Sequence, residues 1–200
     1  MKKIILASQS IDRGELLRRC NLKFEILVSN IDEGHYKQKI TDPVQLVKTL
    51  AEVKALKAKS MLKDKPKEAL IIAADTIVEY QGNVIGKPKN REQAFQTLKN
   101  LTGKAHSLIT GIAITETAEE KIIIDFDETK VHFLPLSDKE IWGYVATNEW
   151  KGRAGAYSIR DKASLFIESI EGSTSNVIGL PMHKIFQILK RDFNLNLFND

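Results

Sequence analysis

The sequence predicts an α/β fold with a mixed, curved central sheet flanked by helices. Strand patterns alternate with helical patterns early in the chain, and strand pairs follow later. Of the 200 residues, 42% are hydrophobic and 28% charged, an ordinary globular composition that excludes disordered, collagenous and coiled-coil proteins. The length predicts one domain over residues 1–200, or one body with two lobes.

A strand and a helix are expected at the start of the chain, joined by a small polar turn. Ile4-Ile5-Leu6-Ala7 has the continuous apolar character of a strand buried on both faces. Ser8-Gln9-Ser10 then leads into a helix capped by Ser8 or Ser10, with Cys20 on its apolar face and in the core. Such a turn is either a plain connection or an anion site, because unpaired N–H groups and the helix dipole point into it.

A second strand is expected over residues 24–28, and two carboxylates follow it. Asp32 and Glu33 are adjacent, which fits either a loop surface or a pair of metal ligands. The residue pattern leaves both interpretations open.

The longest helix is expected to begin at Asp42, as its cap, with Pro43 at the first helical position, and to end near Lys63. On a wheel of about 100° per residue, Lys54 lies roughly 20° from Val47, in the middle of the apolar stripe. The other members of that stripe are Leu50, Ala51, Ala58 and Met61. An ammonium there either pairs with an anion or extends to water, and we expect a functional lysine.

Asp75 interrupts a third buried strand, which covers residues 69–74 and resumes over 76–78. Burying an aspartate is costly unless it is hydrogen-bonded, paired or metal-bound. Asp75 is therefore expected to be a catalytic or metal-binding acid. The alternative is a carboxylate that holds a turn.

The rest of the chain alternates between strand and helix signals. The expected elements are a hairpin around residues 80–84, a helix from Asn90 to Leu101, strands over 106–114 and 121–133, a capping-box helix from Ser137 to Val145, a small-residue stretch over 152–157, a strand over 164–170 and a last helix from Pro181. Gly86-Lys87-Pro88 is not the end of a P-loop, because Pro88 stands where Ser or Thr must bind magnesium.

Charge and cysteine content exclude several classes of protein. The net charge of +4 comes largely from dispersed lysines, so a nucleic-acid surface is not expected. The single cysteine, Cys20, excludes an internal disulfide framework and a multi-thiolate zinc site. The first apolar run is too short for a signal peptide and no stretch approaches about 20 apolar residues, so we expect a soluble, cytoplasmic protein without a membrane partner.

Several segments, taken in order, resemble the Maf family of nucleoside triphosphate pyrophosphatases. They are Leu6-Ala7-Ser8-Gln9-Ser10, Arg13, Glu15-Leu16-Leu17, Asp32-Glu33, Lys54-Ala55, Ala74-Asp75-Thr76, Gly86-Lys87-Pro88, Leu101-Thr102-Gly103, His106, Thr110-Gly111, Ala154-Gly155-Ala156-Tyr157, Glu171-Gly172, Asn176-Val177 and Gly179-Leu180-Pro181. Each motif is weak alone, but the ordered set covers nearly the whole chain and is specific.

The resemblance implies a Maf-like α/β fold with a central cleft, a homodimer, and cleavage of nucleoside triphosphates to monophosphate and pyrophosphate with Mg²⁺ or Mn²⁺. The alternative is a nucleotide-binding regulatory protein with little turnover, because the family is also associated with inhibition of septum formation. The implied site residues are Ser8, Ser10 and Arg13 for phosphate oxygens, Lys54 and Lys87 as further phosphate clamps, Glu33 and Asp75 for the metal, and Asp75 also as the base for the attacking water.

Two positions depart from the family pattern. The two positions are occupied here by Asp12 and Arg160. Family members that resemble the dTTP/UTP type carry Arg at the first position and Gln at the second. Those that resemble the 7-methyl-GTP type carry Trp and Glu. Asp12 either favours the helix N-terminus, or pairs with Arg160, or reads a different base together with Arg160. Our hypothesis from the sequence is an altered base preference with intact phosphate machinery.

Overall fold

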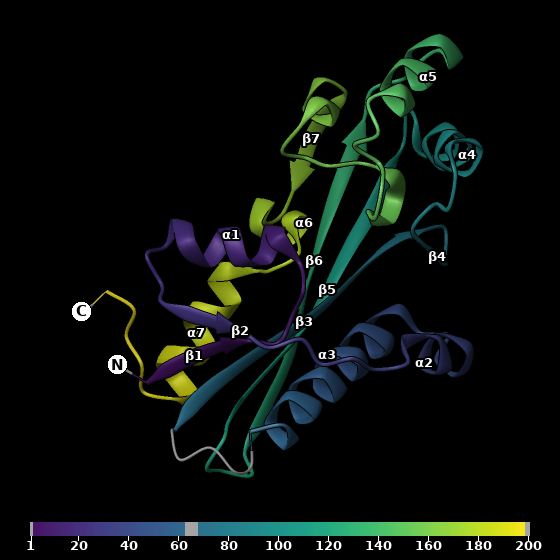
Figure 1. Cartoon of the computed structure of the whole chain (residues 1–200). Coiled ribbons are helices and arrows are strands. Elements are labelled where there is room, and N and C mark those ends of the chain that lie inside the picture. Colours follow the sequence, from purple (N-terminus) through teal and green to yellow (C-terminus); the bar gives the residue numbers. More distant parts are fainter. Residues whose placement is uncertain (1, 63–67, 199–200) are drawn as a thin grey trace. The chain divides into compact units, whose positions relative to one another are not determined.

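The computed structural model describes residues 2–62 and 68–198 (Figure 1). Strands are β1 (Lys3–Leu6), β2 (Phe24–Ile26), β3 (Ala69–Tyr80), β4 (Asn83–Ile85), β5 (Ala105–Glu116), β6 (Ile122–Phe133) and β7 (Ile167–Glu171). Helices are α1 (Ile11–Arg19), α2 (Glu33–Lys39), α3 (Pro43–Ser60), α4 (Arg91–Leu101), α5 (Asp138–Ala146), α6 (Thr174–Ile178) and α7 (Met182–Asp192). Two 3₁₀ turns, η1 (Ala154–Ala156) and η2 (Lys162–Leu165), lie between α5 and β7.

The strands form one mixed sheet in the order β2-β1-β3-β5-β6-β7, with β4 paired to β3. β1 runs parallel to both β2 and β3, whereas β3–β4 and β6–β7 are antiparallel. The predicted hairpin is confirmed, because Tyr80 faces Asn83 across a turn whose two central residues, Gln81 and Gly82, have φ of 51° and 79°. The predicted mixed α/β fold is therefore confirmed.

The chain divides into two compact units, and three strands, β3, β5 and β6, run through both. The first unit comprises Met1–Asp75, Thr110–Asp127 and Gly179–Asp200. The second comprises Thr76–Ile109 and Glu128–Ile178.

In the first unit, α3 covers one face of the sheet. Its alanines Ala51, Ala55 and Ala58 share a buried cluster with alternate residues of β1 and β3, among them Ile5 and Ile71. Figure 1 shows α1 and α7 on the other side of these strands. The residues between, such as Ile4 and Leu70, are fully buried, as expected of strands covered on both faces.

In the second unit, one apolar cluster joins strands and helices around aromatic side chains. Phe133 lies edge-on to the rings of His106, Tyr157 and Phe166, with centroids 4.8–5.0 Å apart. The predicted capping box of α5 is present, because Ser137 and Glu140 bond each other's backbone N–H groups.

His106 gives the fold a pH dependence. Its Nε2 lies 2.9 Å from the hydroxyl of Tyr157, and burial, followed by the charge of His132, lowers the pKa of His106 from 6.5 to about 4. The folded state therefore binds the proton less readily than the unfolded chain. We expect the free energy of unfolding to decline as pH falls from about 6.5 to about 4, by an amount on the order of 3 kcal/mol.

Urea denaturation at a series of pH values checks this, with His106→Asn compared with the same change at exposed His35. The decline should flatten in His106→Asn and persist in His35→Asn. An equally steep decline in His106→Asn would contradict the assignment to this residue.

Several predicted details are wrong. Cys20 is exposed, because α1 ends at Arg19 and Cys20 is its C-cap. Met61 is 46% exposed, because α3 ends at Ser60 and the wheel no longer applies beyond it. The second strand ends at Ile26, and the strand expected over 164–170 begins only at Ile167, after η2. The expected helix end at Lys63 lies outside the described residues.

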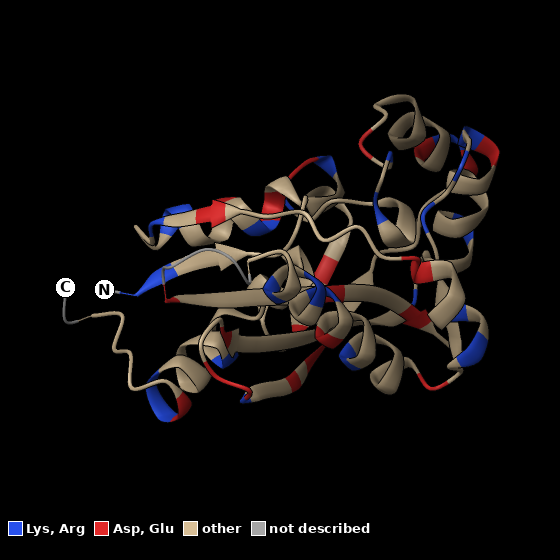
Figure 2. Cartoon of the chain, turned by 60° about the horizontal axis from the view of Figure 1, so that its bottom comes forward, with Lys and Arg blue, Asp and Glu red and all other residues tan. Residues whose placement is uncertain are grey.

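Acidic and basic residues are interspersed along the ribbon of each unit (Figure 2). This distribution agrees with the absence of an arginine-rich block in the sequence. None of the helices within residues 2–62 and 68–198 has the length and apolar character needed to cross a membrane.

Candidate active site

Three segments of the first unit bring Glu33, Lys54 and Asp75 together. Asp75 lies on β3 at the end of the first segment of the first unit, Lys54 lies on α3, and Glu33 begins α2. The Lys54 ammonium nitrogen Nζ is 2.6 Å from Oδ1 of Asp75 and 2.7 Å from Oε1 of Glu33. Of the two alternatives for Lys54, the structure shows the pairing with an anion, here with two carboxylates.

Local sequence places each of these side chains. Asp32 caps α2 by accepting from the backbone N–H of His35, which sets Glu33 in the first turn. α2 packs against α3, so Glu33 can reach Lys54. Gly111 of β5 allows α3 to approach the sheet closely, since a Cβ there would lie 2.2 Å from the carbonyl oxygen of Val47.

The cluster is partly shielded from water. The side chains of Asp75 and Lys54 are 9% and 12% exposed, and that of Glu33 is 37% exposed. A carboxylate as buried as Asp75 is costly without a partner, and the short hydrogen bond from Lys54 offsets that cost.

Glu33 has a second cationic partner, Lys37, that the sequence analysis did not single out. Lys37 Nζ lies 2.7 Å from Oε2, one helical turn along α2. Burial alone would raise the pKa of Glu33, but the hydrogen bonds from Lys37 and Lys54 outweigh it and lower that pKa to about 2. The i,i+4 spacing of Glu33 and Lys37 could have indicated this contact; α2 itself has no buried residue among its members.

Arg13 joins the turn after β1 to two other segments. Its Nε donates to the carbonyl of Gly179 at 2.7 Å, and its Nη1 donates to the carbonyl of Ala74 at 2.9 Å and to Oγ of Ser8 at 3.1 Å. Burial lowers the pKa of Arg13, opposed by the charges of Asp75, Glu33 and Asp12. Arg13 is therefore fixed next to the residue that precedes Asp75.

Ser10 is the cap of α1, as one of the two sequence alternatives predicted. Its hydroxyl oxygen accepts from the backbone N–H of Arg13 at 3.4 Å, and the N–H of Ser10 donates to Oγ of Ser8 at 3.2 Å. Asp12 lies in the first turn of α1, where an acid is favourable. Ser8, Ser10, Asp12 and Arg13 therefore all lie at the entrance of α1.

Two predicted site residues, Lys87 and Arg160, belong to the second unit. Lys87 is exposed in the segment between β4 and α4, and Arg160 is half-buried in the turn that follows Tyr157. Their roles at the site remain predictions from the family resemblance.

The chemistry of Glu33 and Asp75 fits a divalent cation that also binds phosphate. Mg²⁺ is usually held by one or two carboxylates, with substrate phosphates and water completing its shell. Two carboxylates from different segments converge here on one cationic group, Lys54. Among the described residues, no three or more acidic, histidine or cysteine side chains are grouped to hold a metal alone. A metal on this pair would need further ligands, such as water or phosphate oxygens.

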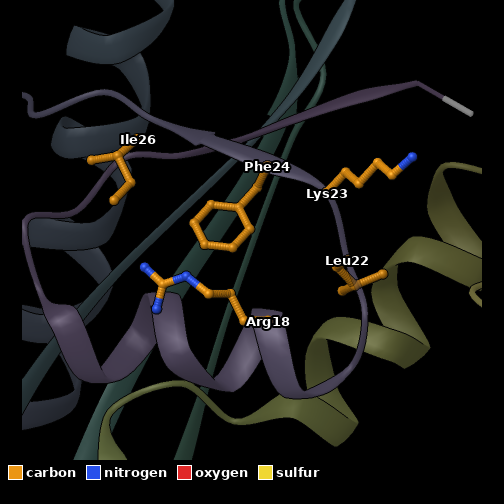
Figure 3. A pocket seen from close by; sticks show the side chains of 5 residues that line it. All are labelled: Arg18, Leu22, Lys23, Phe24 and Ile26. Carbon is orange, nitrogen blue, oxygen red and sulfur yellow. The ribbon is translucent and has the colours of Figure 1, made fainter.

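An open hollow on the first unit is lined by Arg18, Leu22, Lys23, Phe24 and Ile26 (Figure 3). The guanidinium of Arg18 lies 5.7 Å from the centre of the Phe24 ring and pairs with Glu15 at 3.1 Å. None of the predicted site residues lines this hollow.

Fold and site together define a mixed α/β protein with a lysine-bridged pair of carboxylates suited to a metal-bound polyanion. A family model described as "Maf-like protein" matches residues 3–192. The chain belongs to this family.

Relatives of known name match nearly the whole chain. A dTTP/UTP pyrophosphatase of Thermoanaerobacter sp. (strain X514) is 45% identical over 195 residues, which are 98% of this chain and 99% of the relative. A protein of the same name from Caldanaerobacter subterraneus subsp. tengcongensis is 45% identical, over 96% of this chain and 90% of the relative. Another protein of this name, from Geobacillus sp. (strain WCH70), is 41% identical over 96% of this chain and 98% of the relative.

Proposed function

We propose that this chain is a nucleoside triphosphate pyrophosphatase, which hydrolyses the bond between the α- and β-phosphates to give a monophosphate and pyrophosphate. The observation that carries the proposal is the position of Lys54 Nζ between the carboxylates of Glu33 and Asp75. Relatives named dTTP/UTP pyrophosphatase, 45% identical over nearly the full length, support the same reaction.

Charge balance explains why these residue types gather. A nucleoside triphosphate carries about four negative charges, which cations must neutralise before a water molecule can attack. Lys54 and Arg13 supply two positive charges in the first unit. We propose that Ser8, Ser10 and Arg13 contact phosphate oxygens at the entrance of α1, and that Lys87 contributes a further positive charge.

Asp75 is the proposed proton acceptor. It is the most buried carboxylate of the cluster, and Lys54 holds it in one orientation through a 2.6 Å hydrogen bond. A carboxylate at this position contributes through proton transfer from the attacking water. Glu33 and Asp75 would hold Mg²⁺ or Mn²⁺, which when bound polarises the α-phosphoryl group and promotes ionisation of water.

Pyrophosphate release from dTTP, UTP, CTP and GTP, measured with Mg²⁺ and with Mn²⁺, tests the proposal. We expect equal amounts of pyrophosphate and nucleoside monophosphate from at least one of these substrates. Thermal stabilisation by nucleotide without any hydrolysis would contradict it and would indicate a nucleotide-binding regulatory protein.

We further propose that Asp12 and Arg160 alter the base preference while the phosphate machinery stays intact. Asp12 can accept from the amino group of cytosine or from the N–H groups of guanine, and Arg160 can donate to carbonyl and ring-nitrogen acceptors. The double change Asp12→Arg with Arg160→Gln should therefore shift the ratio of kcat/KM values toward dTTP and UTP, by about tenfold or more.

The matched control makes the same changes of charge at the exposed start of α4, as Glu92→Arg with Arg91→Gln. The control should leave the ratio unchanged. Ordinary activity of the unaltered chain on dTTP and UTP, without activity on CTP and GTP, would contradict the proposed preference.

A further inference from the structure

Lys54 occupies the point at which the two proposed metal ligands converge. Its Nζ contacts Oδ1 of Asp75 and Oε1 of Glu33 at hydrogen-bond distance, and its side chain is only 12% exposed. The other oxygen of Glu33 is engaged by Lys37 at 2.7 Å. Both carboxylates are therefore neutralised by ammonium groups of the chain itself.

A divalent cation cannot simply join this arrangement. Both oxygens of Glu33 already contact an ammonium, and a cation bound to Asp75 would lie close to the ammonium that contacts its Oδ1. Two cations a few ångströms apart repel each other strongly in a partly buried site. An ammonium that leaves the carboxylates must find another anion, because stranding it in a shielded position is costly. The phosphate oxygens of a substrate are such anions.

We propose that Lys54 is a built-in competitor for the metal, so that the chain takes up a divalent cation efficiently only together with a polyphosphate. The ammonium exchanges its carboxylate partners for phosphate oxygens as the cation enters between Glu33 and Asp75. This inference rests on the proposed function. It assigns Lys54 two roles in succession: a counter-ion that holds the two carboxylates together, and then a phosphate ligand.

Mn²⁺ binding in the absence of nucleotide tests the competition directly. The fraction of free Mn²⁺ is read by electron paramagnetic resonance at neutral pH for the unaltered chain, Lys54→Met and Lys54→Gln. We expect both variants to bind Mn²⁺ at least about tenfold more tightly than the unaltered chain, because the competing charge is gone. Lys54→Arg keeps the charge and should not bind more tightly.

Lys57→Met is the matched control. Lys57 is an exposed lysine of the same helix, so its loss changes the net charge equally without touching the cluster. It should leave the Mn²⁺ affinity unchanged within about twofold, as expected for an exposed charge. If Lys54→Met and Lys54→Gln, shown to be folded by their thermal transitions, bind Mn²⁺ no more tightly than the unaltered chain, the proposal is overturned.

A measurement on the unaltered chain covers the case in which these variants do not fold. The ¹⁵N resonance of Lys54 Nζ should not move with Mg²⁺ alone, and should move when Mg²⁺ is added with an α,β-methylene analogue of the nucleotide that the chain hydrolyses best. An equal shift with Mg²⁺ alone would overturn the proposal. Pyrophosphate release by the unaltered chain is scored separately, so failure of the enzymatic assignment and failure of the metal competition are distinguishable.

Discussion

Asp75→Asn is expected to lower kcat for pyrophosphate release by about 10³-fold. The amide keeps the size of the side chain and can still accept the hydrogen bond from Lys54. It cannot take a proton from water, and it carries no charge to hold a cation next to Glu33. Removal of a positioned general base alone costs about 10²–10⁴-fold in rate. Steady-state assays with the preferred nucleotide check this value.

The thermal transition of the variant shows whether it is folded, and Asp138→Asn is the matched control. Asp138 is an exposed acid at the start of α5, in the second unit, where it pairs with Lys99. Its change to Asn should leave kcat within about twofold. If the folded Asp75→Asn variant retains more than a tenth of the activity, Asp75 is not the general base.

Gly111→Ala is expected to be the most destabilising small substitution in the first unit. An added Cβ would lie 2.2 Å from the carbonyl oxygen and 2.3 Å from the carbonyl carbon of Val47, both in the backbone of α3. A backbone cannot turn aside as a flexible side chain can, so α3 must move away from β5. We expect a loss of roughly 3 kcal/mol or more in the free energy of unfolding, measured by urea denaturation.

The same substitution at Gly143 provides a control of opposite sign. Gly143 lies within α5, and a Cβ there would meet no atom within 4 Å. Gly143→Ala should therefore stabilise the chain by about 0.5–1 kcal/mol, because alanine loses less backbone entropy in a helix. An unchanged unfolding transition in Gly111→Ala would show that the close approach of α3 to β5 is wrong. Because α3 carries Lys54, a folded Gly111→Ala should also lose activity.

The parts of the site that local pattern could predict are those in long, regular elements. Lys54 stands in the apolar stripe of an 18-residue helix, and Asp75 lies within a continuous buried strand, so the cost of burial alone singled out both residues. The periodicity of apolar residues predicted the longer strands and helices. Capping residues such as Asn90 and Ser137 predicted where helices begin.

The parts that could not be predicted depend on contacts between distant segments or on short elements. α2 was not expected, because it buries none of its residues and so has no apolar stripe to reveal it. Because α2 packs against α3, Glu33 reaches Lys54. The sequence pattern alone did not decide whether Glu33 lies on a loop surface or is a metal ligand. The helical pattern predicts Cys20 on the apolar face of the first helix, whereas α1 ends one residue before it.

The contacts of Arg13 are a further feature that the sequence could not predict. The family resemblance assigned it to phosphate, but residue type alone could not show that its guanidinium would also hold the carbonyls of Ala74 and Gly179. Such contacts join segments more than 60 residues apart in sequence. They give Arg13 a structural role beside the proposed one, so its replacement should affect stability as well as activity.

The most direct test of the central claim is the anomalous scattering of manganese in crystals grown with Mn²⁺ and the α,β-methylene analogue of the nucleotide that the chain hydrolyses best. The account predicts a manganese peak within direct coordination distance of carboxylate oxygens of Glu33 and Asp75. It also predicts that Lys54 Nζ will have moved from those oxygens to the phosphates. A peak bound elsewhere on the chain, with Lys54 still between Glu33 and Asp75 while nucleotide is present, would contradict it.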